Sequence, residues 1–489
     1  MKNIYYIFVI VFISYIPIFY NIEKPPIFIW DEAIYANNAL EMAIHKNFIV
    51  LQNNGQPTLY NVKPPLVIWL QCLSIWIFGA NEFAIRLPSA LAALLTCFAV
   101  FFFAKRNLNP ITGILAVLFL VTTDGYIRIH VSRSGDLDSV LVLFITLYSL
   151  LFFDYLLNSP QNSKKYLALI GLLVFCAFLS KSVAGLMPIL GLFLGMIAVK
   201  KGREVLGNRF IYLVAFTTLL LCGSYYAIRE YLSNGYLEKV KFSEYLRFTK
   251  NIMSWHEHPF WYYLDNMYER FYKYYILFLP LTLIGIFSKN WNFRRFSILG
   301  IIFSVSYFLL ISYPIVKLEW YDAPLYPMLS LLLASTLYQF VSLIIQSQPY
   351  KSVVLAFLCL LIFTLPYYKI YTQNTKFLPT ESLEYDGFAI RELSRTSPNM
   401  KNYKVLLPTK EIEHIDQANF YIKSLNHFKN YEIKLIKNVQ EVENNDVILC
   451  SNSNALEKIK QKFKVEEIST IYESKLIRIK SEVVQFQKL

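Results

Sequence analysis

Two adjacent carboxylates, Asp31 and Glu32, follow shortly after the first apolar run of the chain at 4–20. Ionisable side chains this close to lipid are costly and need a reason. A carboxylate in such a place can act as a general base. The plainer interpretation is that one of the two caps an amphipathic helix, which the apolar positions of 31–46 predict on the membrane surface. Tyr35, one turn further, joins Glu32 as a candidate substrate-site residue.

Cations and a phenol recur in later polar segments. Lys63 precedes Pro64 and Pro65, a common helix start, and Lys317 and Tyr321 stand in one short segment. A Lys at membrane level can simply snorkel to the headgroups. The alternative is that these donors bind and stabilise a departing phosphate.

A third polar segment, 124–138, carries two arginines and two aspartates. Arg128, Arg133, Asp136 and Asp138 could pair with one another, or they could shape a site, with Asp138 at the mouth of the next apolar run. Both interpretations remain open at this stage.

The segment His256-Glu257-His258 is the one possible metal motif. Two imidazoles at this spacing are weak evidence for a site, because a structural metal usually takes four ligands. No cofactor is therefore predicted as a requirement. A divalent ion held through His256 and His258 is an alternative, and His258 is in addition a candidate substrate-site residue.

The elements that must position these residues are membrane helices. The chain has 489 residues, 55% hydrophobic and 17% charged, with a mean hydropathy of +0.39. A soluble protein would carry about 25% charged residues. The net charge of +13 would suggest nucleic acid in a soluble protein. In a chain this apolar it indicates basic cytoplasmic loops, so no nucleic-acid partner is expected.

The spacing of apolar runs predicts about eleven spans. They are 4–20, 88–104, 110–123, 139–157, 166–180, 183–199, 209–228, 273–288, 295–312, 322–341 and 352–368. The run 66–79 is too short to cross and has Gln71 at its centre, which favours an interfacial helix. With the N-terminus inside, the loops that face the cytoplasm hold basic clusters such as Lys105-Arg106, Lys164-Lys165 and Lys200-Lys201, as the positive-inside rule requires. The polar segments described above then share the outer face.

After about residue 370 the composition turns polar. Short strand patterns at 403–408, 431–436, 447–450 and 476–479 alternate with helical patterns at 414–424 and 454–462. We therefore expect a transmembrane domain at 1–369 and a small outer α/β domain at 370–489.

Carboxylates, cations and aromatics thus gather on one membrane face beside a lipid-accessible bundle. Chemistry on a lipid-linked anionic substrate needs this arrangement. A lipid-linked saccharide transporter or flippase, the alternative function, would place polar groups mid-span. The predicted spans are nearly free of them, with Lys181 as the main exception.

The order of these segments resembles the GT-C class of glycosyltransferases that use polyprenyl-phosphate sugars, such as the aminoarabinose transferases of lipid A modification and the protein O-mannosyltransferases. The residues that carry the resemblance are Asp31-Glu32-Ala33 with Tyr35, Lys63-Pro64-Pro65-Leu66 with Trp69, Asn81-Glu82-Phe83, Arg86-Leu87-Pro88, Asp138, Phe178-Leu179-Ser180-Lys181, His258-Pro259 with Tyr262-Tyr263, and Lys317 to Pro324.

The resemblance implies an inverting transferase in a bacterial inner membrane. Its donor would be an undecaprenyl-phosphate sugar, and its acceptor a lipid A, a polysaccharide or a protein outside that membrane. Asp31 takes the role of base, Lys63 and Tyr321 match positions that hold the lipid phosphate, and Asp138 matches a carboxylate that shapes the site. Ile34 and Val62 depart from the aminoarabinose transferases, which carry Arg and Glu there. These departures speak against aminoarabinose as the sugar.

Overall fold

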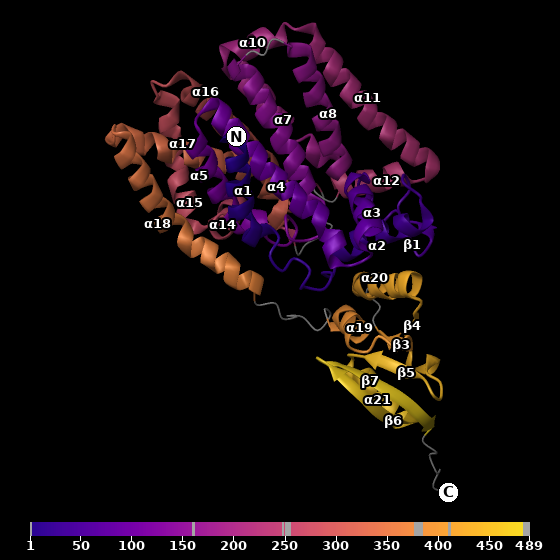
Figure 1. Ribbon diagram of the computed structural model, residues 1–489. Coiled ribbons are helices and arrows are strands. Elements are labelled where there is room, and N and C mark those ends of the chain that lie inside the picture. The colour runs from indigo at the N-terminus through magenta and orange to yellow at the C-terminus, as the bar shows by residue number, and fades with distance from the viewer. Residues whose placement is uncertain are drawn as a thin grey trace.

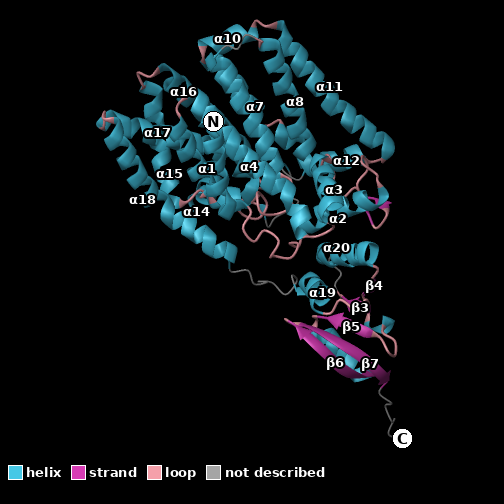
Figure 2. Ribbon diagram, viewed as in Figure 1, coloured by secondary structure: helices cyan, strands magenta, loops and turns pink. Residues whose placement is uncertain are grey.

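The computed structural model describes residues 2–158, 162–246, 249, 256–375, 385–408 and 412–482. A large helical bundle occupies one part of the molecule, and a small α/β unit lies against one end of it (Figure 1). Strands are concentrated in that unit (Figure 2). The predicted combination of a helical membrane protein with a C-terminal α/β domain is confirmed.

Among the described residues, seven helical segments are long and apolar enough to cross a membrane. They are α4 (Glu82–Asn107), α7 (Asp138–Asn158), α8 (Ser163–Lys181) with η1 (Ser182–Gly185), α11 (Arg209–Leu232), α16 (Trp291–Ser312), η5 (Glu319–Leu325) with α17 (Tyr326–Ile344), and α18 (Gln348–Thr375). A pair bent by 118°, α14 (Tyr262–Arg270) with α15 (Lys273–Phe278) and η4 (Leu279–Phe287), makes an eighth if it is one span.

Shorter apolar helices account for the remaining predicted spans. These are α1 (Lys2–Ile18), α5 (Pro110–Val121) and α9 (Ile189–Ala198), and α3 (Leu66–Phe78) is the predicted interfacial helix. Each of the eleven predicted segments is thus largely helical, but length and composition qualify only seven or eight of them. The number of crossings stays a prediction.

The helix α2 (Asp31–His45) forms at its predicted place and is enclosed almost completely. Every residue from Glu32 to Ala43 is buried, because α3 packs on one side and α20 (Ile412–Lys429) on the other. Figure 1 shows α20 directly beside α2. The position of Asp31 is therefore fixed by two parts of the chain that are far apart in sequence.

The C-terminal unit is a five-stranded mixed sheet in the order β4-β3-β5-β7-β6. Its strands are β3 (Asn402–Leu406), β4 (Glu432–Ile436), β5 (Val447–Cys450), β6 (Phe463–Ile471) and β7 (Ser474–Glu482), with α19 (Tyr385–Thr396), α20 and α21 (Ser453–Lys462) between or before them. The pairing of β3 with β4 and β5 is parallel, whereas β7 runs antiparallel to both neighbours. The four predicted strands and two predicted helices are present. The strand β6 was missed, because it is polar and mostly exposed.

Buried polar contacts fasten this unit to the bundle. Glu82 of α4 accepts hydrogen bonds from Arg391 at 2.9 Å and from the Tyr421 hydroxyl at 2.8 Å. Lys423 of α20 donates to Glu41 of α2 at 2.6 Å. A carboxylate buried at such a junction requires a partner, so these pairs fix the orientation of α20 against α2 and α4.

Candidate active site

Asp31 is the first residue of α2, and the backbone immediately before it is strained. Trp30 has φ 72° and ψ −127°, a conformation that normally requires glycine. Asp31 itself is partly exposed. The carboxylate is therefore held at the start of a buried helix while it stays reachable from outside.

The loop between α6 (Asp124–Ile127) and α7 brings an imidazole and a second carboxylate to this point. His130 Nδ1 lies 3.4 Å from Asp136 Oδ2, and the Ser134 hydroxyl both donates to Asp136 and accepts from the His130 backbone N–H. The His130 ring stacks on Trp320, with ring centroids 3.7 Å apart and planes at 17°. The imidazole is thus fixed on its face and on one edge.

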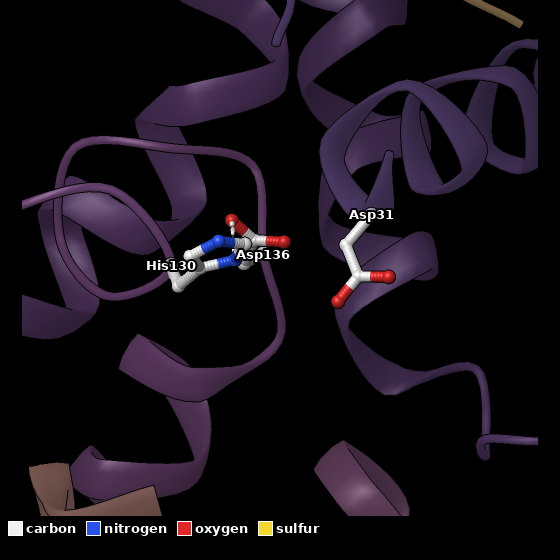
Figure 3. A group of neighbouring side chains, drawn as sticks. All are labelled: Asp31, His130 and Asp136. Atoms are coloured by element: carbon white, nitrogen blue, oxygen red, sulfur yellow. Dashed lines mark ion pairs between the residues drawn. The ribbon is translucent and has the colours of Figure 1, made fainter. Parts of the chain in front are cut away.

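Asp31, His130 and Asp136 form one cluster, in which one ligand atom of each lies within 4.8 Å of the others. Figure 3 shows the Asp31 carboxylate facing the His130–Asp136 pair. Burial alone would lower the pKa of His130, but the carboxylates of Asp136 and then Asp31 raise it above its ordinary value. Burial would raise the pKa of Asp136, but His130 and the Ser134 hydroxyl lower it. The pair therefore favours an imidazolium facing a carboxylate.

The same three side chains offer the oxygen and nitrogen ligands that divalent ions take. Asp136 Oδ1 is a buried atom with no hydrogen-bond partner among the described residues, so it could turn to an ion, whereas His130 could bind one only as a neutral imidazole released from its contact with Asp136. Among the described residues this is the one group of three such side chains close enough for that role. This group does not include His256 and His258, the metal candidates from the sequence.

Glu32 points inward, where all its partners are protein groups. Its oxygens accept from Arg86 Nε at 2.7 Å and Nη2 at 2.8 Å, and from the backbone N–H groups of Phe28 and Gly135 at 2.6 and 2.7 Å. Both Glu32 and Arg86 are buried. Glu32 thus joins α2, α4, the chain before α2 and the His130 loop.

Gly135 shows how closely this loop is packed. A Cβ on Gly135 would lie 2.4 Å from the Ile85 side chain and 2.9 Å from Gln71 Nε2. Gln71 in the middle of α3 donates to the Gly135 carbonyl at 2.7 Å. The polar residue inside the apolar run 66–79 is therefore explained by the support that it gives to this loop.

A second charged pair lies beside the cluster. Lys181 Nζ contacts both oxygens of Asp138, at 2.7 and 2.6 Å, and lies 5.3 Å from the centre of the Tyr321 ring. Tyr35 is buried nearby. Burial first, then the charges of Asp31, Asp136 and Asp138, raise the pKa of Tyr35 well above its ordinary value. Tyr35 therefore stays a neutral hydrogen-bonding group.

Backbone with positive φ lies next to several of these side chains. Trp30, which precedes Asp31, has φ 72°; His130, in the cluster, has φ 71°; and Ser182, which follows Lys181, has φ 60°. Residues other than Gly, Asn, Asp and His rarely adopt positive φ, so Trp30 and Ser182 are the strained positions. Strain of this kind persists where the surroundings over-determine a conformation, typically at a functional site.

The two lysines predicted to bind phosphate are already engaged. Lys63 forms an ion pair with Glu244. Lys317 Nζ donates to the carbonyls of His258, at 2.9 Å, and Pro314, and partial burial lowers its pKa. His258 in turn stacks on Tyr262 with ring centroids 4.0 Å apart. Lys317 thus holds the segment that contains His256 and His258. That segment also pairs with the backbone just before Lys317, through an antiparallel β-bridge between Glu257 and Val316.

The arginines of the predicted site contact other partners. Arg128 pairs with Asp124 at 3.2 Å and is half exposed. Arg133 donates to the carbonyls of Pro17, Ile18 and Tyr20 at the end of α1. For Arg133 these contacts are those of a helix C-cap.

Sequence reasoning did not select His130, Trp320 or Arg86 as site residues, and it noted Lys181 only as a polar exception among the spans. His130 and Trp320 lie in segments that the sequence marked as polar outer loops, which was the available signal. Their stacking joins positions far apart in the chain, so no local pattern could reveal it.

The comparisons with known proteins concern the fold and the family. A model of the family "Dolichyl-phosphate-mannose-protein mannosyltransferase" matches residues 62–226. The crystal structure of ArnT from Cupriavidus metallidurans bound to undecaprenyl phosphate has a TM-score of 0.66 to this chain at 14% identity, and the match covers 97% of this chain and 98% of that one. This chain has the GT-C fold. The resemblance predicted from the sequence is confirmed.

The sequence relatives align with part of this chain. An undecaprenyl phosphate-alpha-4-amino-4-deoxy-L-arabinose arabinosyl transferase of Edwardsiella ictaluri is 26% identical over 329 residues, which are 65% of this chain and 57% of that relative. A protein of Aquifex aeolicus, described only as uncharacterized, is 25% identical over 342 residues, 69% of this chain and 64% of the relative. The matches thus span about three fifths of these relatives.

Proposed function

We propose that this protein is a membrane glycosyltransferase that moves a sugar from an undecaprenyl-phosphate carrier to an acceptor hydroxyl. The observation that carries the proposal is the convergence of Asp31 with the His130–Asp136 and Asp138–Lys181 pairs at one end of a GT-C bundle. The family model and the named arabinosyl transferases support the same donor class. The relative with a named function is a transferase, and the transporter alternative has no support from the relatives.

In the proposed reaction Asp31 is the general base. Its carboxylate takes the proton of the acceptor hydroxyl while that oxygen attacks the anomeric carbon of the donor. The bond from this carbon to the phosphate oxygen breaks, and the polyprenyl phosphate leaves with the electron pair. Attack from the face opposite the phosphate inverts the anomeric centre. The partial exposure of Asp31 suits this role, since the acceptor must reach it.

Charge that develops on the departing phosphate requires donors. Lys181 contacts the Asp138 carboxylate and lies over the Tyr321 ring, and we assign Tyr321, Lys63 and Lys317 to the phosphate. Lys63 is paired with Glu244. A donor phosphate would therefore compete with the Glu244 carboxylate for the same ammonium. Asp138 then shapes the site by holding Lys181.

We further propose a topology. The basic ends of the helices, such as Lys105-Arg106 in the last turn of α4 and Lys200-Lys201 in α10 (Lys200–Leu206), would face the cytoplasm. The site and the α/β domain would then lie outside a bacterial inner membrane, with the N-terminus inside. We place the membrane domain at 1–369 and the outer domain at 370–489.

The acceptor is the open part of the proposal. Lipid A, a surface polysaccharide and an envelope protein all offer hydroxyls on the outer face. The departures at Ile34 and Val62 favour a sugar other than aminoarabinose.

Mass spectrometry of lipid A, surface glycans and envelope glycoproteins tests this proposal. The samples are a deletion strain and the same strain complemented with wild type or with Asp31→Asn. One sugar missing from one acceptor, restored only by wild type, would identify the substrate. Unchanged glycans in the deletion strain, with a lipid-linked saccharide accumulating on the cytoplasmic side, would support a transporter instead.

A further inference from the structure

A large apolar groove lies far from the candidate active site. It has a volume of about 1100 Å³, and its walls come from α15, η4, α17 and α18. In Figure 1 these elements are at the edge of the bundle, with α18 outermost. Only 22% of the most apolar stretch of α18 is buried. The helix stands away from the bundle and leaves the groove open toward lipid.

The groove extends through most of the thickness of a membrane. One end is lined by Tyr272 and Tyr275, and Tyr275 bonds to Thr122 just after α5. The other end is lined by Ser288, Lys289 and Asn290. The nine residues of η4 and the six of α15 lie between these ends, a rise of roughly 27 Å, close to the hydrocarbon core.

The groove is continuous with a polar pocket at its second end. This pocket has a volume of about 260 Å³ and shares Asn290, Phe293 and Gln339 with the groove. Its other lining residues add Asn107, Asn109 and Asn292, so five carboxamides surround it. A polar pocket that opens into an apolar groove has the shape of a lipid, with a headgroup part and a chain part.

The charged side chains around the polar pocket indicate which kind of lipid headgroup it would bind. Lys289 is at the rim, and Lys351 lies 5.8 Å from the ring of Tyr338, another lining residue. No acidic residue is among the described residues that line either cavity. The nearest carboxylate in contact is Asp154, which bonds to Asn107 and is neutralised by Arg106 at 3.0 Å. The surroundings of the headgroup are thus net positive.

We propose that this paired cavity binds an anionic diacyl phospholipid from the leaflet at the Lys/Arg-rich end of the bundle. The acyl chains occupy the groove between η4 and α18. The phosphate lies at Lys289, and the polar pocket beside it is lined by the carboxamides of Asn292 and Gln339, which make no hydrogen bond to another described residue. The site is separate from Asp31 and does not depend on the proposed reaction.

Native mass spectrometry of the purified full chain, titrated with dioleoyl phosphatidylglycerol or dioleoyl phosphatidylcholine, tests the site. The groove is tested with Leu361→Trp, and Leu360→Trp on the same helix is the control. Leu361 lines the groove and Leu360 does not, although they are 67% and 69% exposed. We expect Leu361→Trp to weaken phosphatidylglycerol binding at least fivefold and Leu360→Trp to leave it unchanged.

The headgroup is tested with Lys289→Ala against Lys164→Ala, an exposed lysine outside both cavities. Loss of one basic contact should weaken phosphatidylglycerol binding about fivefold, or about 1 kcal/mol, with no change for phosphatidylcholine or for Lys164→Ala. Equal effects of the paired variants, or equal affinity for the two lipids, would overturn the proposal. So would a dimer that is lost in Leu361→Trp, because a second copy would then occupy the groove.

Discussion

The two ends of the helical bundle differ in how far their charged side chains are buried. At the end that carries Asp31, charged groups such as Glu32, Arg86, Asp138 and Lys181 are buried and paired with one another. At the other end, pairs such as Lys201–Glu204 are exposed, and the buried Asp154 is paired with Arg106, which is half exposed. Burying ions costs several kcal/mol each, so a chain keeps buried pairs where geometry or chemistry requires them. Exposed cations remain solvated and carry no such cost.

The largest expected effect comes from the carboxylate assigned as base. Asp31→Asn should lower transfer by about 10²–10⁴-fold, which is the typical contribution of a positioned general base. The matched control is Asp154→Asn at the other end, which loses its pair with Arg106 and should keep activity within about threefold. Transfer is measured on vesicles containing purified enzyme. Equal losses of transfer in both variants would show that Asp31, like Asp154, matters for folding and not as the base.

The second effect concerns stability. Glu32→Gln should destabilise the protein by about 3–5 kcal/mol, because it leaves the buried Arg86 guanidinium without a counter-charge. Glu204→Gln removes one partner of an exposed pair and should leave the melting temperature unchanged. Thermal unfolding in detergent compares the two. A stable Glu32→Gln variant would mean that water or lipid reaches Arg86.

The third effect concerns the donor. Glu244→Gln should strengthen binding of the undecaprenyl-phosphate donor about tenfold, or about 1.4 kcal/mol, since the phosphate no longer displaces a carboxylate from Lys63. Lys63→Ala should weaken binding by a similar factor. Donor affinity is measured by isothermal calorimetry in nanodiscs. If Glu244→Gln binds donor no more tightly than wild type, Glu244 does not compete with the phosphate.

The smallest effect concerns backbone strain. Trp30→Gly should raise the free energy of unfolding by about 1 kcal/mol, because glycine adopts φ 72° without strain. Trp291→Gly at the start of α16, where the backbone is helical, should lower it by a similar amount. Both tryptophans are exposed, so lost packing is comparable. Chemical denaturation checks the opposite signs, and a loss of stability in both variants would contradict the strain at Trp30.

The sequence predicted what depends on local pattern. The positions of the helices follow from apolar runs, and Asp31 and Asp138 were recognisable because a carboxylate beside a span is unusual. The partners of the site residues could not be predicted from the sequence. Glu32 contacts Arg86, and His130 contacts Trp320. These contacts form because distant segments pack together, and hydrophobic periodicity does not show which segments will pack.

The same limit applies to the cations. Lys63 and Lys317 were selected for their place in outer loops, but their partners Glu244 and the His258 carbonyl come from a distant segment. Arg133 looked like a site residue because of its neighbours, whereas it caps α1. Residue type and loop position therefore gave the region of the site, and only the tertiary contacts assign a partner to each side chain.

The position of α20 against α2 has a consequence for biosynthesis. Residues 412–429 leave the ribosome after the membrane helices described above, so the helix that starts at Asp31 gains one of its walls only after those helices have been made. A nascent chain without α20 would have inserted its helices but would still expose the buried face of α2. The surroundings of Asp31 would therefore be completed only when α20 has been synthesised and has packed against α2.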